Sequence, residues 1–150
     1  NQVQILLKER NLKISITKDE NIPTAVFNYN SIERALTNYI SNAIKYSPEN
    51  GEIKIAVTTL NNNNDIQVTV TDQGCGIAPE FQKKVFDRFF RVENDTHTVK
   101  GTGLGLHLVK TTIEKHHDGQ VFVHSEPGKG STFGFIIPVA PVDDKITMDK

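Results

Sequence analysis

The chain has 150 residues, 37% of them hydrophobic and 23% charged, and a formal net charge of −1. This length and composition are typical of one soluble globular domain, and the near-neutral charge gives no indication of a nucleic-acid partner. No apolar run approaches the roughly 18 residues of a membrane-spanning helix. The single cysteine, Cys75, excludes an internal disulfide and fits a reducing cytosol. Because the chain starts at Asn1 and its only methionine is Met148, we expect a piece of a longer protein.

Short segments in which apolar and polar residues alternate predict strands with one buried face. The polar tract 61–65 separates two of these segments and predicts an antiparallel hairpin. Residues 25–29 are a weaker candidate for one more strand. The principal strand segments are 12–17, 53–57, 66–70, 121–123 and 133–137.

Two long helices are predicted from apolar residues at helical spacing. Ser31 is a suitable N-cap for the first, which runs to about Tyr46, and Gly119 is a suitable stop for the second. A short helix is expected to start at Pro79. Since each strand has one apolar face and each long helix one apolar stripe, the economical fold is a two-layer α/β sandwich. Its mixed, mostly antiparallel sheet of about five strands carries helices on one face.

The organisation expected along the chain is one domain with short flanking segments. Residues 1–11 are expected to be the end of an upstream helix or linker, residues 12–138 the domain, and residues 139–150 a disordered tail. Within the domain, residues 92–100 are polar and without periodicity, which predicts a mobile loop.

One face of the first long helix carries residues suited to a metal and phosphate. Asn38 and Asn42 are four residues apart and therefore lie one above the other, and Lys45 follows on the same face. An amide oxygen is a hard neutral ligand that suits Mg²⁺, which usually takes few protein ligands together with phosphate oxygens. A lysine there could neutralise phosphate charge. A solvated stripe with two asparagines of no special role explains the same pattern.

Asp72 ends a predicted strand and precedes a Gly-x-Gly turn. A carboxylate at this place can accept a hydrogen bond from the exocyclic amine of adenine, whereas guanine offers an oxygen there. This one side chain could therefore select ATP over GTP. The bland interpretation is that Asp72 only begins a turn.

The segment Gly101–Leu106 places alternate glycines directly before a helix. Glycines allow close backbone approach, and a helix N-terminus presents free N–H groups, so the segment suits a phosphate. Arg91 and Lys100 bracket the polar loop before it and could reach a γ-phosphate. A flexible loop before a helix, with ordinary surface charges beside it, is the alternative.

Several familiar motifs are absent. No G-x-x-x-x-G-K-[ST] phosphate loop is present, because Val123 stands where Gly128–Ser131 would need an earlier glycine. Leu106 stands where a dinucleotide fingerprint needs its third glycine. The five histidines show no metal-ligand spacing with Cys75 or with acidic residues.

Taken together, these segments resemble the catalytic and ATP-binding domain of bacterial-type sensor histidine kinases, within the superfamily of DNA gyrase B, Hsp90 and MutL. The resemblance covers roughly residues 12–138. It rests on the order of five motifs along the chain, since each motif alone is a weak signal. The similar segments are Asn38–Pro48 (N box), Asp72–Ile77 (G1 box), Phe86–Arg91 (F box), Gly101–Leu106 (G2 box) and the glycine turn Gly128–Phe133.

The resemblance implies a role for each matching position and the α/β sandwich of that superfamily as the fold. Asn42 would ligate Mg²⁺, and Asn38, Lys45 and Arg91 would act at the phosphates. Asp72 would bind the adenine amine, helped by Thr132 through water. The positions implied to contact ATP are Asn42, Tyr46, Asp72, Gly74, Gly76, Ile77, Lys100, Gly101, Thr102, Gly103, Leu104, Gly105, Leu106 and Thr132.

One departure from the wider superfamily is informative. Gyrase-like and Hsp90-like ATPases carry a glutamate base one helical turn before the magnesium asparagine, where this chain has Asn38. The resemblance therefore implies transfer of the γ-phosphoryl to a histidine on a separate dimerisation domain, and then to a response regulator. No histidine here lies in an acceptor motif.

The setting implied is cytoplasmic, with no direct membrane contact by this domain even if the parent protein is membrane-anchored. A non-enzymatic, ATP-gated binding module and a serine kinase or ATPase of the same superfamily are the alternatives.

Overall fold

The structure is a computed structural model that describes residues 7–9, 11–25, 27–87 and 105–139. Its elements confirm the predicted class, a mixed sheet with helices on one side. In chain order they are β1 (Lys13–Lys18), α2 (Tyr29–Tyr46), β2 (Glu52–Leu60), β3 (Asp65–Asp72), α3 (Pro79–Gln82), α4 (Gly105–His116), β4 (Gln120–Glu126) and β5 (Gly130–Pro138).

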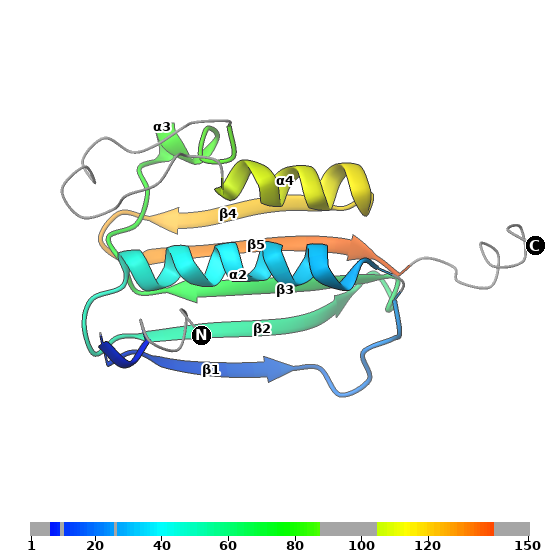
Figure 1. The fold of residues 1–150 in the computed structure, drawn as a ribbon, viewed down its shortest axis with the longest axis horizontal. Coiled ribbons are helices and arrows are strands. Elements are labelled where there is room, and N and C mark those ends of the chain that lie inside the picture. Colours follow the sequence, from blue (N-terminus) through cyan, green and yellow to red (C-terminus); the bar gives the residue numbers. More distant parts are fainter. Residues whose placement is uncertain (1–6, 10, 26, 88–104, 140–150) are drawn as a thin grey trace, which may run out of the picture.

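The five strands form one sheet in the order β1-β2-β3-β5-β4. β1 pairs with β2 in parallel, and the remaining neighbours are antiparallel, including the predicted β2–β3 hairpin. Figure 1 shows α2 and α4 side by side across one face of this sheet, with the short α3 beside the β4 edge. The result is the two-layer sandwich expected from strands and helices with one apolar face each.

The core lies between the helices and the sheet, and strand register decides which residues enter it. Val70 of β3 pairs with Ile55 on one side and with Phe133 on the other, so all three side chains share the helix-facing side. Tyr39 of α2 is fully buried against this layer, and its ring centroid lies 5.5 Å from that of Phe133. Its hydroxyl donates to the Gly134 carbonyl oxygen at 2.8 Å, which anchors α2 to β5.

The beginning of α2 differs from the expectation in two respects. Asn28, not Ser31, is the N-cap, and its side chain accepts a hydrogen bond from the Ser31 backbone N–H at 2.9 Å. Asparagine is among the strongest N-cap residues, so the helix starts at Tyr29. Tyr29, the last residue of the segment 25–29 predicted as a strand, is therefore helical. The described residues of that segment before Tyr29 form no strand.

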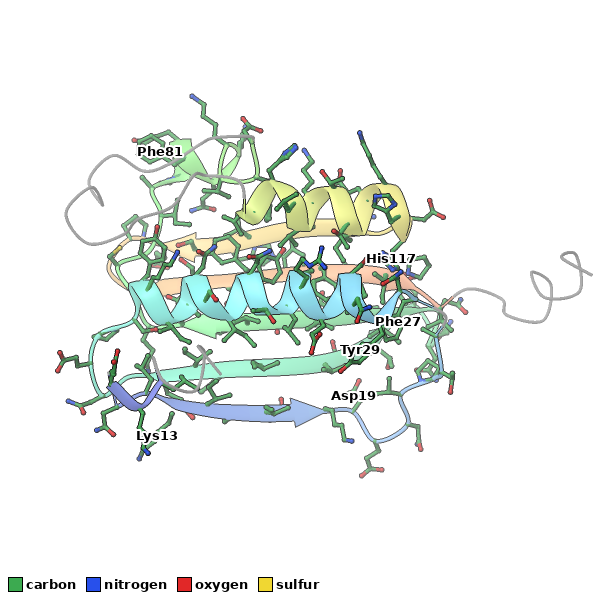
Figure 2. All side chains as sticks on the ribbon, in the orientation of Figure 1. Lys13, Asp19, Phe27, Tyr29, Phe81 and His117 are labelled. Atoms are coloured by element: carbon green, nitrogen blue, oxygen red, sulfur yellow. The ribbon has the colours of Figure 1, made fainter. Side chains whose placement is uncertain are left out.

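His117 holds the end of α4 to the beginning of α2. Its Nε2 accepts the Asn28 backbone N–H at 3.1 Å, and its Nδ1 lies 2.9 Å from the Thr112 carbonyl oxygen. This pair of contacts requires the tautomer that is protonated at Nδ1. Figure 2 shows His117, Phe27 and Tyr29 together at this end of the helical layer. The helices are thus fixed at one end, and the candidate site lies toward the other.

The C-terminal boundary is partly defined. Val139, expected to begin a disordered tail, packs against the core and donates its backbone N–H to the Asn64 carbonyl oxygen at 2.7 Å. Residues 140–150 and the predicted loop 92–100 lie outside the described residues.

Candidate functional site

Asp72, the last residue of β3, is a carboxylate buried to 5% exposure. Its Oδ1 accepts the backbone N–H of Gly74 at 2.8 Å and that of Ser131 at 3.3 Å. Oδ2 has no hydrogen-bond partner within the described part of the chain. Burial raises the pKa of the Asp72 carboxyl above its usual 3.8, and the two backbone N–H groups oppose that rise. Asp72 is therefore an acceptor held in place by two backbone N–H groups, and its Oδ2 is not engaged within the described part of the chain.

The turn after Asp72 passes between the end of α2 and the end of β4, where only glycine fits. A Cβ on Gly74 would lie 2.4 Å from the Tyr46 carbonyl oxygen. A Cβ on Gly76 would lie 2.2 Å from the Glu126 carbonyl oxygen, and its φ of +78° is one that glycine adopts freely. Ile77 packs partly against the core. The Gly74 contact places the predicted base-binding turn against the Tyr46 end of α2, and the Gly76 contact places it against the end of β4.

The other end of the candidate site is formed by α2 and the first residue of α4. Gly105 begins α4, and a Cβ built on it would lie 3.5 Å from Asn38 Oδ1. Asn38 and Asn42 are both half-buried, and neither side-chain amide makes a hydrogen bond within the described residues. Lys45 is exposed on the next turn. The last of the predicted glycines is thus brought beside the first predicted asparagine.

The spacing between the two ends suits a nucleotide. Asn38 and Tyr46 are eight residues apart on α2, which corresponds to about 12 Å along the helix axis. Asp72 and Gly74 lie at the Tyr46 end, and Gly105 lies at the Asn38 end. A base bound at one end would place its phosphates toward the other. Leu106, next to Gly105, packs against the core.

Strand register puts Ser131, rather than Thr132, beside Asp72. β3 and β5 pair Asp72 with Ser131, so these two side chains share the helix-facing side of the sheet. Thr132 pairs with Thr71 on the opposite side, where their hydroxyl oxygens lie 2.9 Å apart. The helper role expected for Thr132 therefore fits Ser131 better. The sequence of the segment Gly128–Phe133 does not show which of its two neighbouring hydroxyl residues lies beside Asp72; the pairing register of β3 and β5 does.

Arg91, Lys100, Gly101, Thr102, Gly103 and Leu104 lie outside the described residues. Of the predicted F box, Phe86 is buried, and its ring packs edge-on against Phe133 with centroids 6.1 Å apart.

A metal ion at this site would be coordinated by side-chain amide oxygens and by the phosphate oxygens of a bound nucleotide. Within the described residues, no group of three or more His, Cys, Asp or Glu side chains could hold a metal ion. The amide oxygens of Asn38 and Asn42 suit Mg²⁺, which takes few protein ligands when phosphate oxygens and water complete its shell. The residues present fit magnesium that arrives with a nucleotide. No helix in the described part of the chain has the length and apolar character needed to span a bilayer.

Comparison with known proteins agrees with this geometry. The model of the family described as histidine kinase-, DNA gyrase B- and HSP90-like ATPase matches residues 28–141. The chain belongs to this family of ATP-binding proteins, and the resemblance drawn from the sequence motifs is confirmed.

Sensor histidine kinases and their catalytic domains are among the proteins that this chain resembles. The chain is 38% identical over 144 residues to Drug sensory protein A of Synechocystis sp., covering 91% of this chain but only 22% of that protein. It superposes on the catalytic domain of histidine kinase ThkA with a TM-score of 0.75 at 30% identity, covering 92% of this chain and 88% of that domain.

Two further solved structures contain a histidine kinase together with a bound molecule. Full-length ShkA in complex with AMPPNP is 27% identical, with a TM-score of 0.76, covering 91% of this chain and 28% of that one. ThkA in complex with the response regulator TrrA is 27% identical, with a TM-score of 0.73, covering 94% of this chain and 39% of that one. This chain corresponds to about a fifth of the length of Drug sensory protein A.

Proposed function

We propose that this chain is the ATP-binding catalytic domain of a sensor histidine kinase, whose γ-phosphoryl donor is Mg·ATP. The observation that carries the proposal is the arrangement along α2. Asp72, held as an acceptor by two backbone N–H groups, lies at one end, and the paired amides beside Gly105 lie at the other. Family membership and the histidine kinases among the similar proteins support the same activity.

In this proposal the described residues bind and orient the nucleotide. Asp72 Oδ2 accepts the adenine amine, and the Gly74–Gly76 turn, packed against the carbonyl oxygens of Tyr46 and Glu126, positions the chain that follows Asp72. Asn42 would supply an amide oxygen to Mg²⁺, which neutralises phosphate charge when bound, and Asn38 would orient a water or phosphate oxygen nearby. Lys45 adds a cation at the phosphates. We assign Arg91, Lys100 and the Gly101–Leu106 backbone to the phosphates from the family resemblance alone.

The reaction proposed is transfer of the γ-phosphoryl to a ring nitrogen of histidine on a separate dimerisation domain. The bond from γ-phosphorus to the bridging oxygen breaks, a phosphorus–nitrogen bond forms, ADP leaves, and the histidine proton passes to a base near the acceptor. Asn38 offers no such base, since an amide does not accept a proton at neutral pH. A response regulator would then take the phosphoryl group. Because the donor is ATP and Cys75 is a free exposed thiol, we propose a cytoplasmic location.

Phosphotransfer to an added acceptor tests this function. The chain is incubated with γ-labelled ATP and Mg²⁺, alone and with the histidine-bearing dimerisation domain of its parent protein. We expect no label on the chain itself and label on the acceptor domain, which is lost in Asn42→Ala. Robust self-labelling, or ATP binding by calorimetry without any transfer, would refute the kinase proposal. The second result would favour the ATP-gated binding module.

A further inference from the structure

Ser125, the next-to-last residue of β4, joins three segments through one hydroxyl group. Its Oγ accepts the Ile77 backbone N–H at 2.7 Å, lies 2.9 Å from the Gly130 carbonyl oxygen, and lies 2.8 Å from Ser131 Oγ. Ile77 closes the turn that follows Asp72. Ser125 thus connects the turn beneath the candidate base pocket with the residue that faces Asp72.

The protons in this group of contacts can be assigned by counting. A serine hydroxyl has one proton and two lone pairs. The Gly130 carbonyl can only accept, so the Ser125 proton is donated to it. The Ile77 N–H occupies one Ser125 lone pair, and the other accepts the Ser131 proton. Ser131 consequently donates its only hydroxyl proton to Ser125 and can offer only lone pairs to any other group.

Gln82, the last residue of α3, holds the same turn from the other side. Its Nε2 donates to the Ile77 carbonyl oxygen at 2.8 Å and to the Ser125 carbonyl oxygen at 2.9 Å. Both amide protons are used, and both backbone polar groups of Ile77 are held, its N–H by Ser125 and its carbonyl by Gln82. Sequence reasoning assigned no role to either side chain.

We propose that Ser125 and Gln82 are positioning residues that set the base preference of this site. They hold the Ser131 hydroxyl as an acceptor beside the Asp72 carboxylate, so these two side chains, as described here, offer a bound base acceptors only. Such a pair favours a purine that carries an amine at position 6 and disfavours one that carries an oxygen there. The inference rests on the proposed function, because it assumes that the Asp72 pocket binds the base.

Removal of the Ser125 hydroxyl changes the group to which the Ser131 hydroxyl can donate its proton. In Ser125→Ala, Ser131 loses the acceptor for its proton, and the hydroxyl is free to turn and donate toward Asp72. That proton would compete with the 6-amine for the carboxylate and would offer a 6-oxo purine a donor. The discrimination between the two purines should therefore fall, not only the affinity for both.

The test compares calorimetric dissociation constants for Mg·ATP and Mg·ITP, whose purines differ at position 6 and in the N1 proton. For Ser125→Ala we expect the ITP/ATP ratio to fall by roughly 5- to 10-fold, the effect of about one neutral hydrogen bond. Gln82→Ala, whose side chain is only half-buried, should move the ratio in the same direction. Ser125→Thr keeps the hydroxyl and should retain the native ratio.

Thr132→Val is the matched control. It removes a hydroxyl from the neighbouring residue of β5 on the opposite side of the sheet, where Thr132 pairs with Thr71. Its ratio should equal that of the unmodified chain. If Ser125→Ala and Gln82→Ala weaken ATP and ITP by equal factors, the two residues are only structural and the inference is overturned. If the unmodified chain binds neither nucleotide, the proposed function fails, and the inference fails with it.

Discussion

Replacing Asp72 by asparagine should exchange an acceptor for a donor at one point of the pocket while side-chain size stays the same. Because Oδ1 accepts two backbone N–H groups, from Gly74 and Ser131, the asparagine must place its amide oxygen at that position. The amide nitrogen then occupies the position of Oδ2, from which it donates into the pocket. The orientation of the new side chain therefore follows from the backbone around it.

The magnitude follows from the hydrogen bond that is lost. A hydrogen bond to a charged group contributes about 1.5–3 kcal/mol, and about 1.4 kcal/mol corresponds to a tenfold change in affinity. Asp72→Asn should therefore raise the ATP dissociation constant by about 10- to 150-fold. The affinity for GTP, whose purine carries an oxygen at position 6, should fall far less or rise.

Isothermal titration with Mg·ATP and Mg·GTP at neutral pH measures both effects. A thermal unfolding curve for each variant separates loss of binding from loss of fold. Unchanged ATP affinity would refute the role given to Oδ2. Equal weakening of ATP and GTP in a variant that melts like the unmodified chain would refute the argument that the backbone fixes the orientation of the amide.

Two further predictions concern stability. Tyr39→Phe removes the buried hydroxyl that donates to the Gly134 carbonyl oxygen, and it should lower the free energy of unfolding in urea by about 1 kcal/mol; an unchanged value would show that this bond contributes nothing. Burial raises the pKa of Asp72 in the folded state, so the stability linked to its protonated form is present below pH 3.8 and is lost as the pH rises through the raised pKa. Asp72→Asn should accordingly gain stability relative to the unmodified chain as the pH rises from 3.8 through that pKa, in urea titrations over a pH series, whereas a difference independent of pH would contradict it.

Much of the local arrangement of the candidate site follows from the sequence, because its motifs are local. Asn38 and Asn42 lie on one helical face by spacing alone, and the glycines after Asp72 mark a turn wherever they occur. The alternation of apolar residues was sufficient for the strands and for the two-layer class. The start of α2 was misplaced because Asn28 and Ser31 are both good caps, and their local sequence does not rank them.

What the sequence determined by itself is the family and the list of chemical groups that it brings to the site. What only the tertiary structure decided is which of these groups meet. Thr132 and Ser131 differ by one position, and the pairing of β3 with β5 assigns Ser131 to the side of Asp72 because side chains alternate between the faces of a sheet. The contacts of Ser125 with Ile77 and with Gln82 join residues 48 and 43 positions apart. Such contacts depend on how three segments pack together, and no local pattern carries that information.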